Sequence, residues 1–157
     1  MKKLLISAAL IALAGSALAQ DAMKLVKPDT LTWREHPVFK GAQIAILLGD
    51  PTKAEAVVQR VKFPPNFRVP PHTHPYAEVV TVISGNFGNG MGETFDPSKG
   101  ELLKPGSVFA LPAKHVHFVW TENEETIYQV VFTGPGGSTS STQPTIRARS
   151  RNAEPLK

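Results

Sequence analysis

Apolar and polar residues alternate along short segments of the chain, and turn-forming residues separate these segments. In the clearest case, residues 55–63, the side chains that share one face are Val57, Gln59, Val61 and Phe63. Val58, Arg60 and Lys62 lie on the opposite face. Because successive side chains of a strand point to opposite faces, this segment is predicted to form an antiparallel strand with one buried face.

Further β-rich segments follow along the middle of the chain. They cover residues 42–48, 79–83, 86–91, 108–111, 116–120 and 126–133. The residues between them are rich in Gly, Pro and Asp, which is typical of turns, and no stretch keeps a helical period beyond a turn or two. Short strands separated by turns predict an all-β barrel or sandwich, and 157 residues suit one domain.

One of these strand signals begins directly after a cluster of metal-ligand residues. His72 and His74 are two positions apart, so an extended chain places them on the same face, and Glu78 joins them if the extended path continues past Pro75. His117 lies in the later strand of residues 116–120. Three imidazoles and a carboxylate are ligands for a divalent transition metal.

The segment that precedes these ligands is rich in proline. Pro64 to Pro71 cannot be helical and is predicted to be a stiff connection outside the middle of a sheet, which delivers His72 in a fixed direction. Two further histidines are expected to lie outside the ligand set. His115 is expected at the barrel mouth, beside bound metal or substrate, and His36 is expected on the surface because no partner stands at a useful spacing.

These residues carry a family resemblance. His72, Thr73 and His74, with Glu78 and Gly85 at fixed distances, resemble the first cupin motif, and Gly106, Pro112 and His117 match the spacing of the second. The resemblance implies a double-stranded β-helix, or jelly-roll barrel, with one metal held inside by His72, His74, Glu78 and His117. Asn66, Lys114 and Thr121 depart from the motifs, at turn and strand-end positions where the family usually has Gly, Gly and Asn.

The pocket around the metal is predicted from strand parity. Its lining is expected to comprise Val80, Val82, Val119, Phe87, Phe109 and either Tyr128 or Gln129. Such a lining is mostly apolar, which fits a small, weakly polar or aromatic molecule. Three nitrogens and one carboxylate oxygen leave open positions on octahedral Fe(II), Mn(II) or Ni(II), whereas the same four could close a tetrahedral Zn(II) site, and the sequence does not choose among them.

Two classes of function agree with this site. The first is a metal-dependent oxidoreductase, dioxygenase-like, that acts on a small organic molecule. The second is a non-catalytic protein that binds or senses a ligand or metal. The fold alone does not decide between them, because folds of this kind host many activities.

The two ends of the chain differ from its body. Residues 1–19 have a basic start, a short apolar run and an Ala-x-Ala site, which predicts a signal peptide cut after Ala19 and a periplasmic or secreted protein without membrane contact. Residues 20–40 are interpreted as an N-terminal arm, 41–136 as the barrel and 137–157 as a disordered basic tail.

Charge and cysteine content exclude several classes of function. The 17 basic residues exceed the 13 acidic ones only because of the two ends, so no basic surface for nucleic acid is expected on the body. The absence of cysteine excludes disulfides, thiolate metal sites and a cysteine nucleophile. Val79 and Ile83 are apolar on the outward face of their strand, which predicts cover by the N-terminal arm or a homodimer partner.

Overall fold

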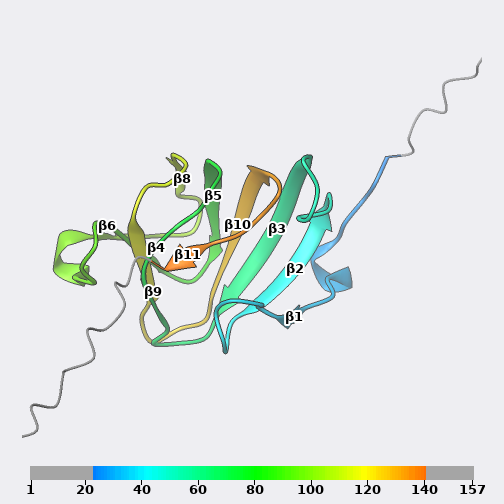
Figure 1. Ribbon diagram of the computed structural model, residues 1–157. Coiled ribbons are helices and arrows are strands. Elements are labelled where there is room, and N and C mark those ends of the chain that lie inside the picture. Colours follow the sequence, from blue (N-terminus) through cyan, green and yellow to red (C-terminus); the bar gives the residue numbers. More distant parts are fainter. Residues whose placement is uncertain (1–22, 141–157) are drawn as a thin grey trace, which may run out of the picture.

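Two antiparallel sheets form the body of the protein in a computed structural model that describes residues 23–140 (Figure 1). The first sheet has the order β1-β2-β3-β10-β5-β8, and the second has the order β11-β4-β9-β6-β7. The strands of the first sheet are β1 (Arg34–Glu35), β2 (Gln43–Leu48), β3 (Ala56–Phe63), β10 (Thr126–Thr133), β5 (Glu78–Ser84) and β8 (Val108–Leu111). Those of the second are β11 (Thr139–Ser140), β4 (Arg68–Thr73), β9 (His117–Thr121), β6 (Phe87–Met91) and β7 (Glu101–Leu103). Two short 3-10 turns, Pro28–Thr30 and Pro97–Lys99, complete the described elements. The predicted all-β jelly-roll architecture is confirmed.

The core lies between the two sheets and follows the alternation seen in the sequence. Val57, Val61 and Phe63 on β3 are almost completely buried. They belong to one apolar cluster with residues from the opposite sheet, such as Val69 and Val119. Burial of one face of each sheet is what an alternating pattern requires, and it fixes the register of the strands.

The proline-rich segment differs from its prediction. Pro70 and Pro71 lie within β4, which pairs with β9 on one side and with β11 on the other. The sheet accommodates them because the register between β4 and β9 shifts between Val69 and His72. Proline lacks an N–H, so an irregularity in the ladder at this point avoids a missing hydrogen bond. The shift also leaves His72 directly opposite His117.

The departures from the family motifs have local structural reasons. Asn66 and Lys114 have positive φ angles of 57° and 62° and are the two non-glycine residues with positive φ in the described chain. Glycine adopts this left-handed conformation without steric cost, which explains why it suits these turns. The hydroxyl of Thr121 accepts a hydrogen bond from the Phe67 amide (2.9 Å) and donates one to the Pro64 carbonyl (2.7 Å).

The C-terminal segment enters the fold further than its composition indicated. Residues 137–140 were assigned to the tail, but Thr139 and Ser140 form β11 and pair with Thr73 and His72. This segment buries little apolar surface, but its backbone can still pair with the free edge of β4. Residues 141–157 and the predicted signal peptide lie outside the described residues, so those two assignments stay predictions.

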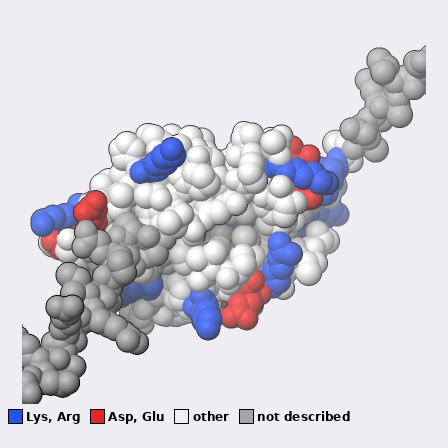
Figure 2. Space-filling model, in the orientation of Figure 1, with Lys and Arg blue, Asp and Glu red and all other residues white. Residues whose placement is uncertain are grey.

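The face drawn in Figure 2 carries no large surface of one charge. Most of it is uncharged, and several Lys and Arg side chains at its edges lie beside Asp or Glu. No helix among residues 23–140 has the length and apolar character needed to cross a membrane. Val79 and Ile83 are 44% and 40% exposed, so the described part of the N-terminal arm, residues 23–40, does not cover them.

Candidate metal centre

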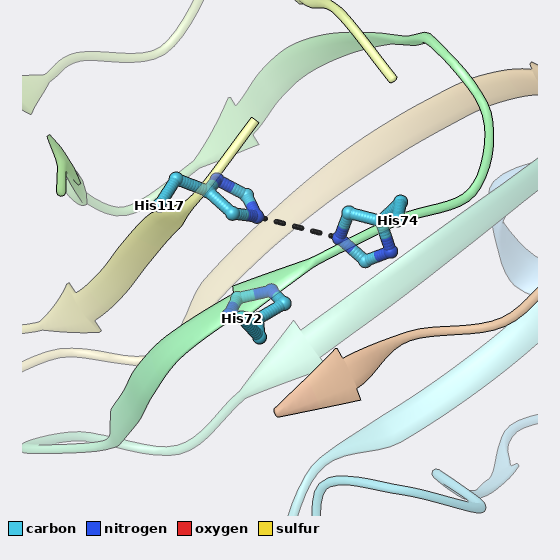
Figure 3. Close-up of side chains that lie close together, drawn as sticks. All are labelled: His72, His74 and His117. Atoms are coloured by element: carbon cyan, nitrogen blue, oxygen red, sulfur yellow. Dashed lines mark hydrogen bonds between the residues drawn. The ribbon is translucent and has the colours of Figure 1, made fainter. Parts of the chain in front are cut away.

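Three histidines meet between the sheets. His72 comes from β4 and His117 from β9, and His74 follows directly after β4 (Figure 3). One ring nitrogen of each lies within 4.8 Å of the others. His72 and His117 are buried, and His74 is partly buried. The predicted convergence of these three side chains is therefore present in the structure.

The hydrogen bonds of the three rings set their tautomers. Nδ1 of His72 lies 2.9 Å from the Pro70 carbonyl oxygen, and Nδ1 of His74 lies 3.0 Å from the Gly137 carbonyl oxygen. Nδ1 of His117 is 3.4 Å from the amide oxygen of Asn89. Each of these oxygens accepts hydrogen bonds, so each Nδ1 carries the proton. In the neutral rings every Nε2 then has a free lone pair, as metal ligation requires.

The geometry of the free nitrogens fits a metal ion. Nε2 of His74 and Nε2 of His117 lie 3.3 Å apart (dashed line in Figure 3). Two nitrogens bound to one ion at about 2.1 Å each are separated by roughly 3 to 3.5 Å. Without a cation, two lone pairs would face each other at this distance. Three histidines are thus positioned to bind a metal.

Burial keeps two of these ligands, His72 and His117, unprotonated. Desolvation lowers the pKa of His72 to about 4, although the Pro70 carbonyl acts in the opposite direction. Desolvation, with smaller contributions from His72 and His74, lowers the pKa of His117 to about 2. At neutral pH both rings are neutral, so a metal does not have to displace protons from them.

Glu78 is the fourth predicted ligand, and it comes from the opposite sheet. It opens β5, is 6% exposed, and its Oε1 lies 3.8 Å from Nε2 of His74. Burial raises the pKa of Glu78, and His74 partly offsets this effect. The carboxylate stands outside the close group of three nitrogens, so its ligation stays a prediction. A bound cation would favour its ionised form.

A cavity of about 270 Å³ opens beside the three histidines. The expected lining residues that are present are Val80, Val119, Phe87, Phe109 and Tyr128. Val82 is buried but does not line the cavity. Burial, followed by the nearby Glu78 carboxylate, raises the pKa of Tyr128 well above its usual value, so its hydroxyl remains protonated. A mostly apolar pocket with a few polar groups is typical of a small-molecule site.

The family model for the cupin family matches residues 52–151, which include all four predicted ligands. The chain is a cupin. Among similar proteins, the germin-like protein subfamily 2 member 1 of Arabidopsis thaliana is 35% identical over 95 residues, which are 60% of this chain and 43% of that protein. The chain spans less than half the length of the germin-like plant proteins it matches.

Solved structures show the same fold at low sequence identity. The polyketide cyclase RemF from Streptomyces resistomycificus superposes with a TM-score of 0.65 at 22% identity, over 79% of this cupin and 89% of that chain. A recombinant oxalate oxidase in complex with glycolate gives a TM-score of 0.51 at 22% identity, over 63% of this cupin and 54% of that chain. These likenesses confirm the cupin barrel.

Two predicted pocket residues lie elsewhere in the cupin. The alternative between Tyr128 and Gln129 is decided for Tyr128, since Gln129 does not line the cavity and accepts a hydrogen bond from Arg60 Nε (3.2 Å). His115 is exposed and does not line the cavity either, so its expected place at the barrel mouth stays a prediction. It precedes β9, in a turn where its amide hydrogen-bonds to the Pro112 carbonyl (3.3 Å). Strand parity does not hold through a turn.

Several site residues of the cupin were not expected from the sequence. His36 is partly buried and lines the cavity, so its assignment to the surface is wrong. Phe39 and Tyr76 line the cavity as well, and Asn89 and Gly137 orient two of the histidines. Asn89 carried a weak signal, because a polar residue between two glycines interrupts an apolar strand. The role of Gly137 rests on a backbone carbonyl, and no side-chain pattern could have revealed it.

Proposed function

We propose that this cupin is an exported, metal-dependent oxidoreductase, dioxygenase-like, that acts on a small organic molecule. The observation that carries the proposal is the convergence of one ring nitrogen from each of three histidines beside a mostly apolar cavity. With Glu78 included, this donor set suits Fe(II), Mn(II) or Ni(II) with open positions, while Zn(II) remains the alternative. A metal bound there would act as a Lewis acid and a template for the substrate.

The residues of the chain prepare the site for such chemistry. The carbonyls of Pro70 and Gly137 hold two imidazoles in the tautomer that presents Nε2. Tyr76 stacks on Phe132 at a centroid distance of 4.2 Å, and its ring also lies against His74. These aromatic groups limit access of water to one side of the site, which strengthens electrostatic interactions inside it.

One of the similar structures is an oxidoreductase, which supports the proposal without fixing the substrate. One solved cupin structure is an oxalate oxidase with glycolate bound, so this fold accommodates oxidation of small organic acids. Another is a polyketide cyclase, so the same barrel also accommodates larger carbon skeletons. A cavity of about 270 Å³ favours the smaller class of molecule.

Metal reconstitution with oxygen measurement tests the proposal. Protein recovered from the periplasm is stripped of metal, reloaded separately with Fe(II), Mn(II), Ni(II) or Zn(II), and supplied with phenols, diketones and small hydroxy acids. We expect one redox-active metal to give oxygen uptake and the zinc form to give none. A measured mass that corresponds to a chain beginning at Gln20 would agree with export and cleavage.

Tight metal binding without turnover across this panel would contradict the oxidoreductase and favour the binding or sensor protein. Failure of any divalent metal to bind would contradict the metal centre and the oxidoreductase, and it would leave a protein that binds an organic ligand. The His115→Ala variant is a suitable control, since this exposed side chain lies outside the cavity.

We further propose that a second copy of the chain covers the outer face of the first sheet. Val131 on β10 pairs with Val79 on β5, and Val79 pairs with Ala110 on β8, so apolar side chains form a row across three strands. Val131 is 39% exposed and Val79 is 44% exposed. An exposed apolar row at the edge of a sheet is suited to association with a like surface.

Light scattering of the purified protein is expected to give the mass of a dimer. The double variant Val79→Lys with Val131→Lys should give a monomer, because each lysine would bury a charge in the interface. Met91→Lys is the matched control, since Met91 is 46% exposed on the second sheet. A monomeric mass for the unmodified protein would contradict the dimer.

A further inference from the structure

His36 belongs to a closed loop between β1 and β2 at the edge of the cavity. Its backbone amide donates to the Ala42 carbonyl (2.9 Å), and the Ala42 amide donates to the Phe39 carbonyl (3.0 Å). The imidazole stacks on the ring of Phe39 at a centroid distance of 4.6 Å and an angle of 18°. These contacts hold the ring of His36 in one place.

Two backbone amides fix the tautomer of His36. Its Nδ1 accepts hydrogen bonds from the amides of Val38 (3.2 Å) and Phe39 (3.0 Å). An acceptor nitrogen carries no proton, so the proton of the neutral ring is on Nε2. Desolvation, with a smaller contribution from His74, lowers the pKa of His36 to about 4, so the ring is neutral at neutral pH. His36 is therefore a fixed N–H donor.

The placement of His36 relates it to the three-histidine group. Phe39, which stacks on His36, also meets the ring of His72 edge to face at 5.3 Å. His36 and the three metal-site histidines line the same cavity, together with Arg34 two residues before His36. In this tautomer the metal-site rings offer lone pairs, whereas His36 offers a proton. The cavity lining therefore offers both lone pairs and an N–H donor.

We infer that His36 is a substrate-positioning residue whose Nε2–H donates to an oxygen of a molecule held at the three-histidine group. The ligand class is then a small organic molecule with two oxygen-bearing groups, one at the three histidines and one at His36. Arg34, which also lines the cavity, favours a carboxylate or another oxyanion as the group that His36 contacts. The cavity of about 270 Å³ lies near the lower end of the range for small-molecule sites, about 300 to 1,000 Å³, which favours a small ligand. This inference rests on the proposed metal site.

Two substitutions test the roles of the two ring nitrogens of His36 separately. In His36→Asn the side-chain oxygen can replace Nδ1 as acceptor for the loop amides, but the Nε2 donor is lost. In His36→Gln the amide nitrogen can replace the Nε2 donor, but the loop loses its acceptor. A positioning role predicts that Asn impairs ligand binding and Gln retains it. If His36 has only a structural role, His36→Asn should keep the stability of the loop and His36→Gln should lower it. Neither substitution should then affect ligand binding selectively.

Cobalt-loaded protein allows binding to be followed through the visible absorption of the metal. The probes are azide, acetate, and the dicarboxylates oxalate, malonate and succinate. Azide needs only the metal for binding. We expect one dicarboxylate to bind more tightly than acetate. His36→Asn should weaken that dicarboxylate about tenfold and leave azide affinity, cobalt content and melting temperature close to wild type, because one hydrogen bond to a charged group is lost. His36→Gln should restore most of the affinity.

Three outcomes would overturn the inference. They are no preference for any dicarboxylate over acetate, equal effects of His36→Asn on azide and dicarboxylate, and unchanged dicarboxylate binding in His36→Asn. All three presuppose cobalt bound at the site. If the wild-type protein does not bind cobalt, the metal centre is contradicted instead. Failure of the proposed metal site and failure of the role of His36 can therefore be told apart.

Discussion

Replacing His117 with alanine is expected to abolish stable metal binding by this cupin. His117 is 3% exposed, and its Nε2 lies 3.3 Å from Nε2 of His74. Loss of a group that only orients a ligand already costs about 10-fold to 100-fold in metal affinity, so loss of a ligand should exceed about 100-fold. Metal content after dialysis, measured by mass spectrometry for wild type and variant, checks this.

A thermal shift gives a second readout of the same effect. Metal in 100-fold excess over its dissociation constant stabilises the folded state by about 2.7 kcal/mol, and the His117→Ala variant should lose this gain. His115→Ala is the matched control, because it removes an exposed imidazole two residues away and should bind metal like wild type. Equal metal content in the two variants would contradict the assignment of His117.

The same measurement of metal content tests whether Glu78 is a ligand. Its Oε1 lies 3.8 Å from Nε2 of His74, although Glu78 is not part of the group of three nitrogens that lie within 4.8 Å of one another. Glu78→Gln keeps the shape and removes the charge, so a ligand role predicts a loss of affinity similar to that of His117→Ala. A small change would limit the ligand set to the three histidines.

Replacing Phe63 with alanine is expected to cause the largest loss of stability. Phe63 is fully buried and lies in contact distance of three aromatic rings, Phe39, Phe67 and Tyr128. Removal of a buried phenylalanine ring costs about 3 to 5 kcal/mol through lost burial and the cavity that remains. Urea unfolding at constant metal concentration measures the loss.

Phe95→Ala is the control for this substitution. Phe95 is only partly buried and contacts Phe118 and Trp120 near the surface of the second sheet. Its removal should cost clearly less than the removal of Phe63. A loss below about 1 kcal/mol for Phe63→Ala would mean that the core relaxes around the missing ring, contrary to the packing described above.

The loss of Phe63 should also reach the site. Its ring supports Phe39, which contacts both His36 and His72, and Tyr128, which lines the cavity. We therefore expect weaker metal binding in Phe63→Ala even at temperatures where the variant is folded. This distinguishes a packing effect on the site from global unfolding.

The sequence by itself determined the β architecture and the convergence of three histidines. Alternation along β3 specified which face is buried, because a strand has a period of two. His72 and His74 share a face for the same reason, and His117 was found through the second motif. Local patterns were sufficient where the chain is regular.

Tertiary structure decided the parts of the site where the chain is irregular. A register shift between Ile127 and Tyr128 interrupts the pairing of β10 with β5, and only the folded sheet showed that Tyr128 lines the cavity. The register shift after Val69 let prolines enter β4. Bulges change which face a residue occupies without changing the apolar pattern.

The remaining site groups come from segments that are distant in sequence. His36 lies 36 residues before His72, and the Gly137 carbonyl that orients His74 lies 63 residues after it. Neither has a periodic signal, because one is a single side chain in a loop and the other is a backbone oxygen. The sequence therefore determined the three histidines that can hold a metal. Only the packing of the segments that carry His36 and Gly137 decided what orients His74 and what else lines the cavity.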